Sequence, residues 1–403
     1  MLFFAVVYTV EGIGQAKVGV IWQPLTHFLK EVHGWTAVQV SASLAVLDIP
    51  WVIKPLYGLV SDFFPLFGFR RRSYLLLANA GAVAAFLFVT QMSAPGALIT
   101  SLVLTSVAMA VSSTLCGALL VENGQRHNAS AAFVNQQWLW FSGAVVAASL
   151  LGGLLTEVFS PSGALQAAAW IAAAAPVAVL VCLTLVDEER AGVSLDELRA
   201  RALAAMATVR SRTLLLIAVF LFCYYFSPGF GTPLYFHMTD TLGFSQGFIG
   251  LLSSVSAAGW IAGGLLYRRT LARMDTQRLL RVSVLFGTAS SLSYLTLADP
   301  ATAVIVYFVN GIAGMVANIA TLTLAAQHCP PRAEGFAFAG LMSVINLSEP
   351  LSDTIGALLY EHVFGGWLAP LIVLSAAVTL SVLILLRLMR IDELDHVVPR
   401  IRT

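Results

Sequence analysis

Long apolar stretches dominate this sequence and leave little room for anything else. About twelve stretches of helix length are separated by short polar breaks, and 58% of the residues are hydrophobic while 11% are charged. A helix needs about 20 apolar residues to cross a bilayer, so twelve such helices use most of the 403 residues. The pattern predicts an all-α polytopic membrane protein and excludes a soluble globular enzyme.

The apolar stretches form two sets of six, separated by a charged segment from Asp187 to Arg212. The spans predicted in the first set cover residues 3–28, 38–60, 73–92, 97–121, 131–155 and 164–186. Those predicted in the second set cover residues 213–236, 244–267, 280–298, 301–327, 335–360 and 366–389. We therefore expect two six-helix halves, residues 1–186 and 213–390, with a linker over 187–212 and a tail over 391–403.

The basic residues predict the orientation in the membrane. Of the 22 Lys and Arg, 19 fall in alternate loops or at the C-terminal end, which places both termini in the cytoplasm. The first span lacks a basic leader and a small-residue cleavage site, so we expect it to be retained. In the linker, Ser194 and Glu197 form a capping box before an apolar stripe, which predicts an amphipathic helix on the membrane surface; a solvated linker is the alternative.

Composition also limits the kinds of partner and cofactor that this chain can bind. A net charge of +1 provides no field for holding nucleic acid. The four cysteines and seven histidines show no disulfide, zinc or redox spacing, and no Walker-type loop is found. No cofactor, metal or catalytic set is implied. We expect a monomer whose partners are a small-molecule solute, protons and the lipid bilayer. High alanine and more Arg than Lys favour a bacterial cytoplasmic membrane.

The loop after the second span carries the most specific motif. Residues 58–62 (Gly-Leu-Val-Ser-Asp), followed by Arg70, Arg71 and Arg72, are similar to a signature of the major facilitator superfamily. Residues 49–62 and 70–75 together resemble the folate-biopterin transporter family, and residues 334–346 look like the eleventh helix of that family. The resemblance implies the major facilitator fold, with twelve helices, and a folate or pterin as the solute.

Three positions depart from that family pattern. Ser113 and Gly117 stand where family members carry acidic residues on the fourth helix, before Glu122. Lys30-Glu31 stands where a lysine and an aspartate usually follow the first helix. A bacterial branch with a different cargo fits these departures equally well.

Four charged residues lie within the first two spans, where each needs a partner, an aqueous cavity or a function. In an antiparallel hairpin, residues at equal depth have a constant sum of sequence numbers, which pairs Glu11 with Lys54 and Lys17 with Asp48 around the turn near His33. We predict two cross-helix ion pairs. In one interpretation the paired charges only neutralise one another. In the other, an anionic solute binds a lysine of one pair, and a proton neutralises the carboxylate that the lysine leaves.

Further polar residues are candidate solute or proton-coupling residues. Glu349 and Asp353 lie one turn apart beside Pro350, with Asn346 one turn earlier; a polar patch facing the other half is the alternative. Neutral residues that can bind a planar heterocycle are Gln15, Asn135, Gln136, Tyr224 and Tyr225. Polar contacts between helices explain these neutral residues nearly as well.

The loop motif predicts a cytoplasmic gate. By the superfamily resemblance, Asp62 packs at the start of the eleventh span near Glu334, where unpaired helix amides favour an anion. Gly58 precedes Asp62 by one turn, and Arg70, Arg71 and Arg72 can pair with Glu122. These contacts would close the cytoplasmic side and break as the halves move.

The sequence thus predicts a secondary active transporter that moves a small polar, anionic solute by alternating access with protons. A facilitator for another metabolite, such as a peptide fragment or a sugar conjugate, is one alternative. A non-transporting membrane sensor is another. An intramembrane enzyme is disfavoured because no nucleophile, base or metal set occurs at helical spacing.

Overall fold

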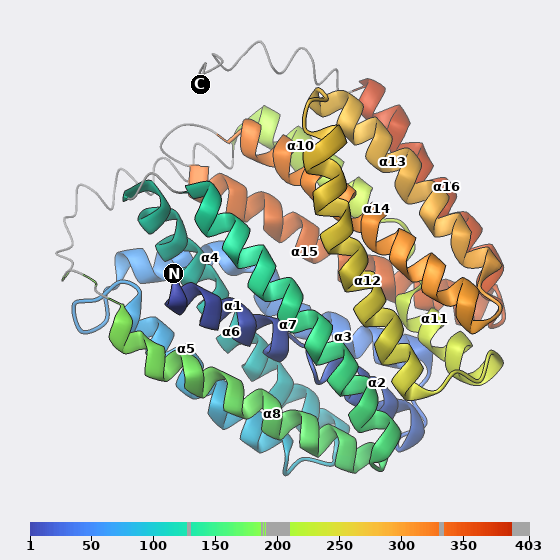
Figure 1. Cartoon of the computed structure of the whole chain (residues 1–403), viewed down its shortest axis with the longest axis horizontal. Coiled ribbons are helices and arrows are strands. Elements are labelled where there is room, and N and C mark those ends of the chain that lie inside the picture. Colours follow the sequence, from blue (N-terminus) through green and yellow to red (C-terminus); the bar gives the residue numbers. More distant parts are fainter. Residues whose placement is uncertain (127–129, 187, 189, 191–209, 330–333, 389–403) are drawn as a thin grey trace. The chain divides into compact units, whose positions relative to one another are not determined.

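The computed structural model describes residues 1–126, 130–186, 188, 190, 210–329 and 334–388, and these residues are almost entirely helical (Figure 1). The chain divides into two compact units. Unit 1 comprises Met1–Leu198 and Gly243–Ala257, and unit 2 comprises Arg199–Leu242 and Ala258–Thr403. The predicted linker helix at Ser194 and the predicted tail over 391–403 lie outside the described residues.

Unit 1 is a bundle in which α1 packs on α7 and α8, and α5 packs on α6 and α8. Its helices are α1 (Leu2–Gly14), α2 (Trp22–Glu31), α3 (Ala37–Val52), α4 (Lys54–Phe63), α5 (Arg72–Val89), α6 (Pro95–Arg126), α7 (Ser130–Val158), α8 (Pro161–Cys182) and the short η1 (Leu183–Leu185). The beginning of α12 (Gln246–Leu266) also belongs to unit 1. There a Cβ on Gly153 would come within 2.8 Å of the Gly250 Cα. The two helices therefore approach closely here, which requires glycine at both positions.

Unit 2 is a second bundle, in which α13 packs on α14 and α16, and α10 packs on α15. Its helices besides the end of α12 are α10 (Arg212–Tyr225), α11 (Gly231–Phe236), η2 (His237–Thr241), η3 (Tyr267–Leu271), α13 (Thr276–Ser293), η4 (Tyr294–Thr296), α14 (Pro300–Gln327), α15 (Glu334–Leu358), η5 (Leu359–Val363) and α16 (Leu368–Leu388). Apolar side chains such as Phe220, Leu280 and Leu324 form a core shared by α10, α13 and α14.

Local sequence signals set several helix starts. Thr36 and Gln39 form a reciprocal capping box at the start of α3, with the Gln39 amide 3.4 Å from Thr36 Oγ1 and the Thr36 amide 3.1 Å from Gln39 Oε1. Asp299 accepts the Ala301 amide at 2.9 Å, and Pro300 follows it at the first helical position of α14. These caps satisfy backbone donors that a helix start leaves unpaired.

Three spans predicted as continuous helices are interrupted. The first span stops at Gly14 and resumes at Trp22, because the chain folds back so that the Val20 amide donates to the Ile13 carbonyl at 3.0 Å. A Cβ at Gly19 would overlap that carbonyl oxygen, so only glycine fits there. The second span breaks at Ile53, just before Lys54 and Pro55, because proline lacks the amide that would continue the helix.

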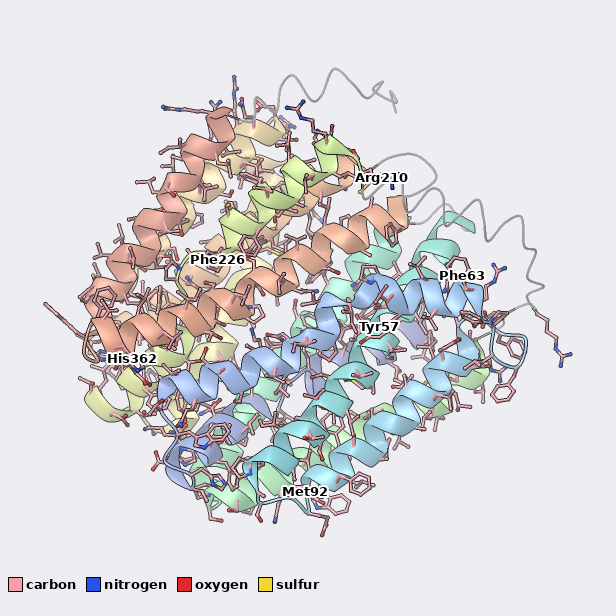
Figure 2. All side chains as sticks on the ribbon, turned by 180° about the vertical axis from the view of Figure 1, so that it is seen from behind. Tyr57, Phe63, Met92, Arg210, Phe226 and His362 are labelled. Carbon is pink, nitrogen blue, oxygen red and sulfur yellow. The ribbon has the colours of Figure 1, made fainter. Side chains whose placement is uncertain are left out.

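The third interruption separates α10 from α11 over residues 226–230, where Pro228 and Gly229 stop the seventh span (Figure 2, where Phe226 is labelled). The non-helical backbone and the last turn of α10 before it are held by α15. The Gly229 amide donates to the Ser352 carbonyl at 3.0 Å, Ser348 Oγ donates to the Phe222 carbonyl at 2.7 Å, and Ser352 Oγ donates to the Ser227 carbonyl. Irregular backbone at membrane depth requires such internal partners.

The described residues include eight helices long and apolar enough to cross a membrane, α3 and α4 being taken together. The apolar helices Leu2–Gly14 and Arg212–Tyr225 are shorter. These helices support an integral membrane protein. The total of twelve spans stays a prediction.

Candidate transport site

A partly buried polar cluster in unit 1 contains two of the charged residues of the first two spans, Glu11 and Lys54. Glu11 projects from the last turn of α1, just before the break, and Lys54 is the first residue of α4, just after the break at Ile53. Both side chains are therefore anchored where the backbone leaves regular helix. α6 lies against both α1 and α4 and completes the cluster.

Glu11 and Lys54 are joined through a third residue. Lys54 Nζ donates to Ser113 Oγ at 3.2 Å, and Ser113 Oγ donates to Glu11 Oε1 at 3.0 Å. Lys54 Nζ also lies 4.2 Å from the centre of the Trp51 ring, within cation–π range. The predicted direct ion pair is thus replaced by a hydroxyl bridge, because α6 places Ser113 between the two charges.

The second predicted pair is direct. Lys17 Nζ lies 2.5 Å from Asp48 Oδ2, so the pairing expected from the hairpin register is confirmed. Lys17 belongs to the break between α1 and α2, and Asp48 belongs to α3. The two predicted pairs therefore differ in construction, one being in direct contact and the other separated by a hydroxyl.

Several buried oxygens on the helices of unit 1 have no hydrogen-bond partner in the part of the chain that the structure describes. They are Glu11 Oε2, Gln15 Oε1, Tyr57 Oη and Gln136 Oε1. The Gln15 backbone amide donates to the Glu11 backbone carbonyl at 3.0 Å, so these two residues lie one turn apart. Unpaired buried oxygens are costly unless something binds them, so we treat this cluster as a candidate binding site.

The candidate residues of unit 2 are held by neighbouring hydroxyls. Tyr224 Oη donates to Ser283 Oγ at 3.1 Å, and Tyr225 Oη lies 2.9 Å from Thr321 Oγ1. Glu349 of α15 is exposed on its own unit and close enough to Tyr225 to act on it electrostatically. The two tyrosines are therefore fixed in place by α13 and α14.

The other candidates on α15 differ in exposure. Asn346 and Asp353 are half-buried, and Pro350 lies inside the helix, which continues to Leu358. A Cβ at Gly229 would overlap Asp353 Oδ1, so Asp353 faces the interruption after α10. Glu122 and Asn135 fall in α6 and α7, but their side chains lie outside the described part of the chain.

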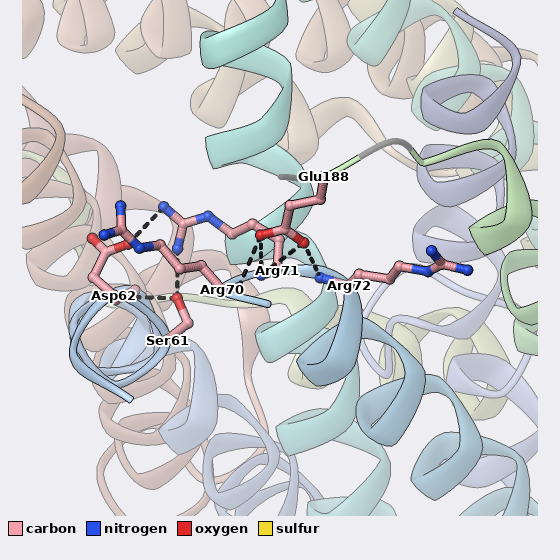
Figure 3. Close-up of polar contacts among 7 residues, drawn as sticks. Ser61, Asp62, Arg70, Arg71, Arg72 and Glu188 are labelled. Carbon is pink, nitrogen blue, oxygen red and sulfur yellow. Dashed lines mark hydrogen bonds and ion pairs between the residues drawn. The ribbon is translucent and has the colours of Figure 1, made fainter. Parts of the chain in front are cut away.

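An ion pair joins the end of α4 to the loop that follows it (Figure 3). Arg71 Nη2 lies 2.8 Å from Asp62 Oδ1, and Arg71 Nη1 donates to Ser61 Oγ at 2.5 Å. Arg71 is only 7% exposed, so its charge depends on these partners. Gly58 precedes this pair by one turn, and the closest atom to a Cβ there would be Thr114 Cγ2 at 3.9 Å.

The same loop binds a carboxylate that the sequence did not reveal. Glu188 Oε1 accepts the amides of Arg70 and Arg71, each at 2.9 Å, and Glu188 Oε2 accepts the Arg72 amide at 2.8 Å (Figure 3). The three amides precede or begin α5, where the helix dipole favours an anion. The predicted pairing of the arginines with Glu122 lies outside the described side chains, whereas Glu188 binds their backbone.

Replacement of Glu188 by glutamine is expected to loosen this loop. Glutamine retains one acceptor and no charge, so the contact should weaken by about 1–2 kcal/mol, and amide exchange at residues 70–72 should become about 5- to 30-fold faster. Hydrogen–deuterium exchange measures this. Glu157→Gln is a matched control, because Glu157 accepts the Gly247 amide at 2.9 Å at a different place. Unchanged exchange at residues 70–72 in Glu188→Gln would contradict the assignment.

Comparison with known proteins identifies the family. The model of the BT1 family matches residues 14–397, which is nearly the whole chain. The chain belongs to the BT1 family. It is similar to the folate-biopterin transporter of Synechocystis, with 29% identity over 368 residues that cover 88% of this chain and 73% of the relative. The probable folate-biopterin transporter 2 of Arabidopsis thaliana is 25% identical over 402 residues, covering 91% and 79%.

The fold is also that of known transporters. A solved D-xylose–proton symporter superposes with a TM-score of 0.73 at 12% identity, covering 95% of this chain and 96% of the symporter. At this identity the likeness shows the fold alone, which is that of the major facilitator transporters. Together, the family, its named members and the fold show a membrane transporter for a small molecule and not an enzyme.

Proposed function

We propose that this BT1-family chain is a secondary active transporter for a folate- or pterin-like anion, driven by protons and working by alternating access. The observation that carries the proposal is the Glu11–Ser113–Lys54 cluster, a buried acid and base held apart by a neutral hydroxyl. Charges within spanning helices are unfavourable unless paired or used. The names of the relatives supply the solute class.

The solute chemistry suits the cluster. A folate or pterin is planar, rich in hydrogen-bonding groups and often anionic. Lys54 can bind an anionic group, and the unpaired oxygens of Gln15 and Gln136 can accept N–H groups of a heterocycle. We assign the solute and proton-coupling role to Glu11, Gln15, Lys17, Asp48, Lys54, Asn135, Gln136, Tyr224, Tyr225, Asn346, Glu349 and Asp353.

Proton coupling follows from charge balance. When an anion binds Lys54, Glu11 loses its counter-charge and becomes an unpaired carboxylate in a dry environment. Binding of one proton to Glu11 restores neutrality, so the loaded site can change its access without a bare ion in low dielectric. Release of the anion reverses both steps.

We assign the gate to the loop after α4, with Gly58, Asp62, Arg70, Arg71, Arg72 and Glu122 as its residues. In this proposal the gate closes the cytoplasmic side while the halves 1–186 and 213–390 alternate about the solute. Both termini are cytoplasmic, the protein works as a monomer, and the membrane is the bacterial inner membrane. The Asp62–Arg71 ion pair supports the gate because it fixes the loop in one conformation.

Uptake by reconstituted vesicles tests the function. Purified protein in liposomes, with an acidic exterior, should accumulate labelled folate or biopterin above the external concentration, and a protonophore should abolish the accumulation. A labelled nucleoside serves as the unrelated solute. Binding without translocation would point to a sensor and contradict the proposal.

Asp62→Asn is expected to slow uptake about tenfold while leaving KM for the solute unchanged, since the gate controls how often the site changes access and does not contact the solute. Initial rates over a range of solute concentrations measure both quantities. Glu31→Gln is the control, because Glu31 is an exposed acid at the end of α2, away from the gate, and pairs with Lys30 at 3.3 Å. A normal maximal rate in Asp62→Asn rules out the gate.

A further inference from the structure

Ser113 has a fixed role in the charge cluster. A serine hydroxyl has one proton to donate and two lone pairs to accept. Its oxygen accepts from Lys54 Nζ at 3.2 Å, so its single proton is directed to Glu11 Oε1 at 3.0 Å. Lys54 has no acceptor and the Glu11 carboxylate has no donor, which leaves no other assignment of these two bonds.

The Lys17–Asp48 pair provides an internal comparison. Both pairs join the first two spans, yet Lys17 Nζ is 2.5 Å from Asp48 Oδ2, whereas Lys54 contacts a neutral oxygen. A hydrogen bond to a neutral acceptor is weaker than a direct contact with a carboxylate. Lys54 is therefore more easily transferred to an incoming anion than Lys17 is.

Glu11 retains one oxygen for a proton. Oε1 is occupied by Ser113, whereas Oε2 is buried and has no partner among the described residues. Among the described side chains, the titratable groups that act on Glu11 are Tyr8 on its own helix, Cys116 on α6 and Lys54 on α4. A phenol and a thiol are neutral near pH 7. On α7 and α8, which also pack on α1, the charged residue is Glu157, and it accepts the Gly247 amide.

We propose that Ser113 is a positioning residue that keeps Lys54 available to the anionic group of the solute while orienting Glu11 to bind the coupling proton. The inference rests on the proposed proton-coupled function. The solute anion takes the Lys54 N–H donor from Ser113, and one proton from the entry side binds Glu11 Oε2. Ser113 continues to donate to Oε1. The site is neutral before and after, so one proton accompanies each negative charge that Lys54 binds.

The test compares three variants in liposomes at external pH values from about 5.5 to 8, which bracket neutral pH. Ser113→Ala removes the bridge, so the ammonium and the carboxylate are expected to contact each other directly. Ser113→Thr retains the hydroxyl. Ser112→Ala is the matched control, because the neighbouring Ser112 accepts a hydrogen bond from Asn79 at 3.2 Å on another face of α6.

For Ser113→Ala we expect KM to rise about tenfold, because the anion must now break a direct ion pair. The pH of half-maximal uptake should move about one unit to the acid side, because the adjacent ammonium opposes protonation of the acid. Ser113→Thr and Ser112→Ala should keep the wild-type pH profile. A merely structural serine would alter the amount of folded protein and leave the pH profile unchanged.

The outcomes separate the inference from the function on which it rests. If wild-type liposomes do not respond to the protonophore, proton coupling itself fails. If the wild type responds and Ser113→Ala keeps its KM and pH profile, the role of Ser113 is wrong. Thermal melting of each variant with and without folate gives a binding measurement that needs no transport. An acid shift in Ser113→Thr equal to that in Ser113→Ala also overturns the proposal.

Discussion

Lys54→Met is expected to lower kcat/KM for solute uptake about 100-fold or more. Truncating one member of a buried, hydrogen-bonded charge pair costs about 2–5 kcal/mol, and each 1.4 kcal/mol is a factor of ten. Two interactions are lost here, because the solute anion loses its ammonium partner and Glu11 loses its counter-charge. Initial uptake rates of the wild type and the variant at matched protein amounts measure the effect.

A double variant separates transport from stability. Lys54→Met alone should lower the melting temperature, since it leaves Glu11 without a base. Combining it with Glu11→Gln removes both charges, and replacing a buried ion pair by neutral groups of similar size is often neutral for stability. We expect the double variant to melt near the wild type and still not transport. If it transports at the wild-type rate, the pair only stabilises unit 1.

The helix pattern was largely predictable because membrane helices are specified by apolar length. The prediction for residues 301–327 differs by one residue from α14, and that for 335–360 differs by two residues or fewer from α15. The interruptions were not predicted, although signals for them exist. Pro228 and Gly229 in the seventh span, and Gly19 in the first, are helix-breaking residues that hydropathy alone ignores.

The candidate site was predictable only as far as chain connectivity reaches. The hairpin register correctly paired Lys17 with Asp48, because the two spans are joined by a short turn. It did not reveal Ser113, since the rotation and depth of α6 relative to that hairpin are set by tertiary packing. A polar residue on the fourth span was the available signal, but Ser112 and Ser113 are adjacent and the sequence does not say which faces Glu11.

Glu188 could not be predicted from the sequence for a different reason. Three acids, Asp187 to Glu189, follow the sixth span, and the sequence alone gives no reason to choose the middle one. Its ligands are backbone amides, which every residue except proline possesses, so no side-chain motif identifies them. The charge of the arginines suggests that their side chains bind a carboxylate, but it is their backbone amides that bind Glu188.

The interruption after α10 explains how unit 2 holds its tyrosines. Tyr224 and Tyr225 are the last residues of α10, directly before the non-helical segment. That segment is fixed by Ser352, which accepts the Gly229 amide through its carbonyl and donates its hydroxyl to the Ser227 carbonyl. The position of both tyrosines therefore depends on how closely α15 approaches the segment.

Gly356→Ala is expected to destabilise unit 2 by about 3 kcal/mol or more, because a clash between the new Cβ and the Gly229 backbone cannot be relieved by a rotamer change. A Cβ at Gly356 would overlap the Gly229 carbonyl oxygen and come within 2.8 Å of the Gly229 nitrogen. Moving the segment away stretches the 3.0 Å bond from Gly229 to Ser352. For a unit of this size the melting temperature should fall by roughly 6–12 °C.

Gly340→Ala is the matched control on the same helix, because nothing lies within 4 Å of a Cβ at Gly340. Alanine favours a helix over glycine by about 1 kcal/mol, so this variant should melt at or slightly above the wild-type temperature. Thermal melting in detergent, followed by tryptophan fluorescence, compares the two. Equal melting of Gly356→Ala and Gly340→Ala would show that α15 does not press against the interruption, and the two tyrosines would then need another anchor.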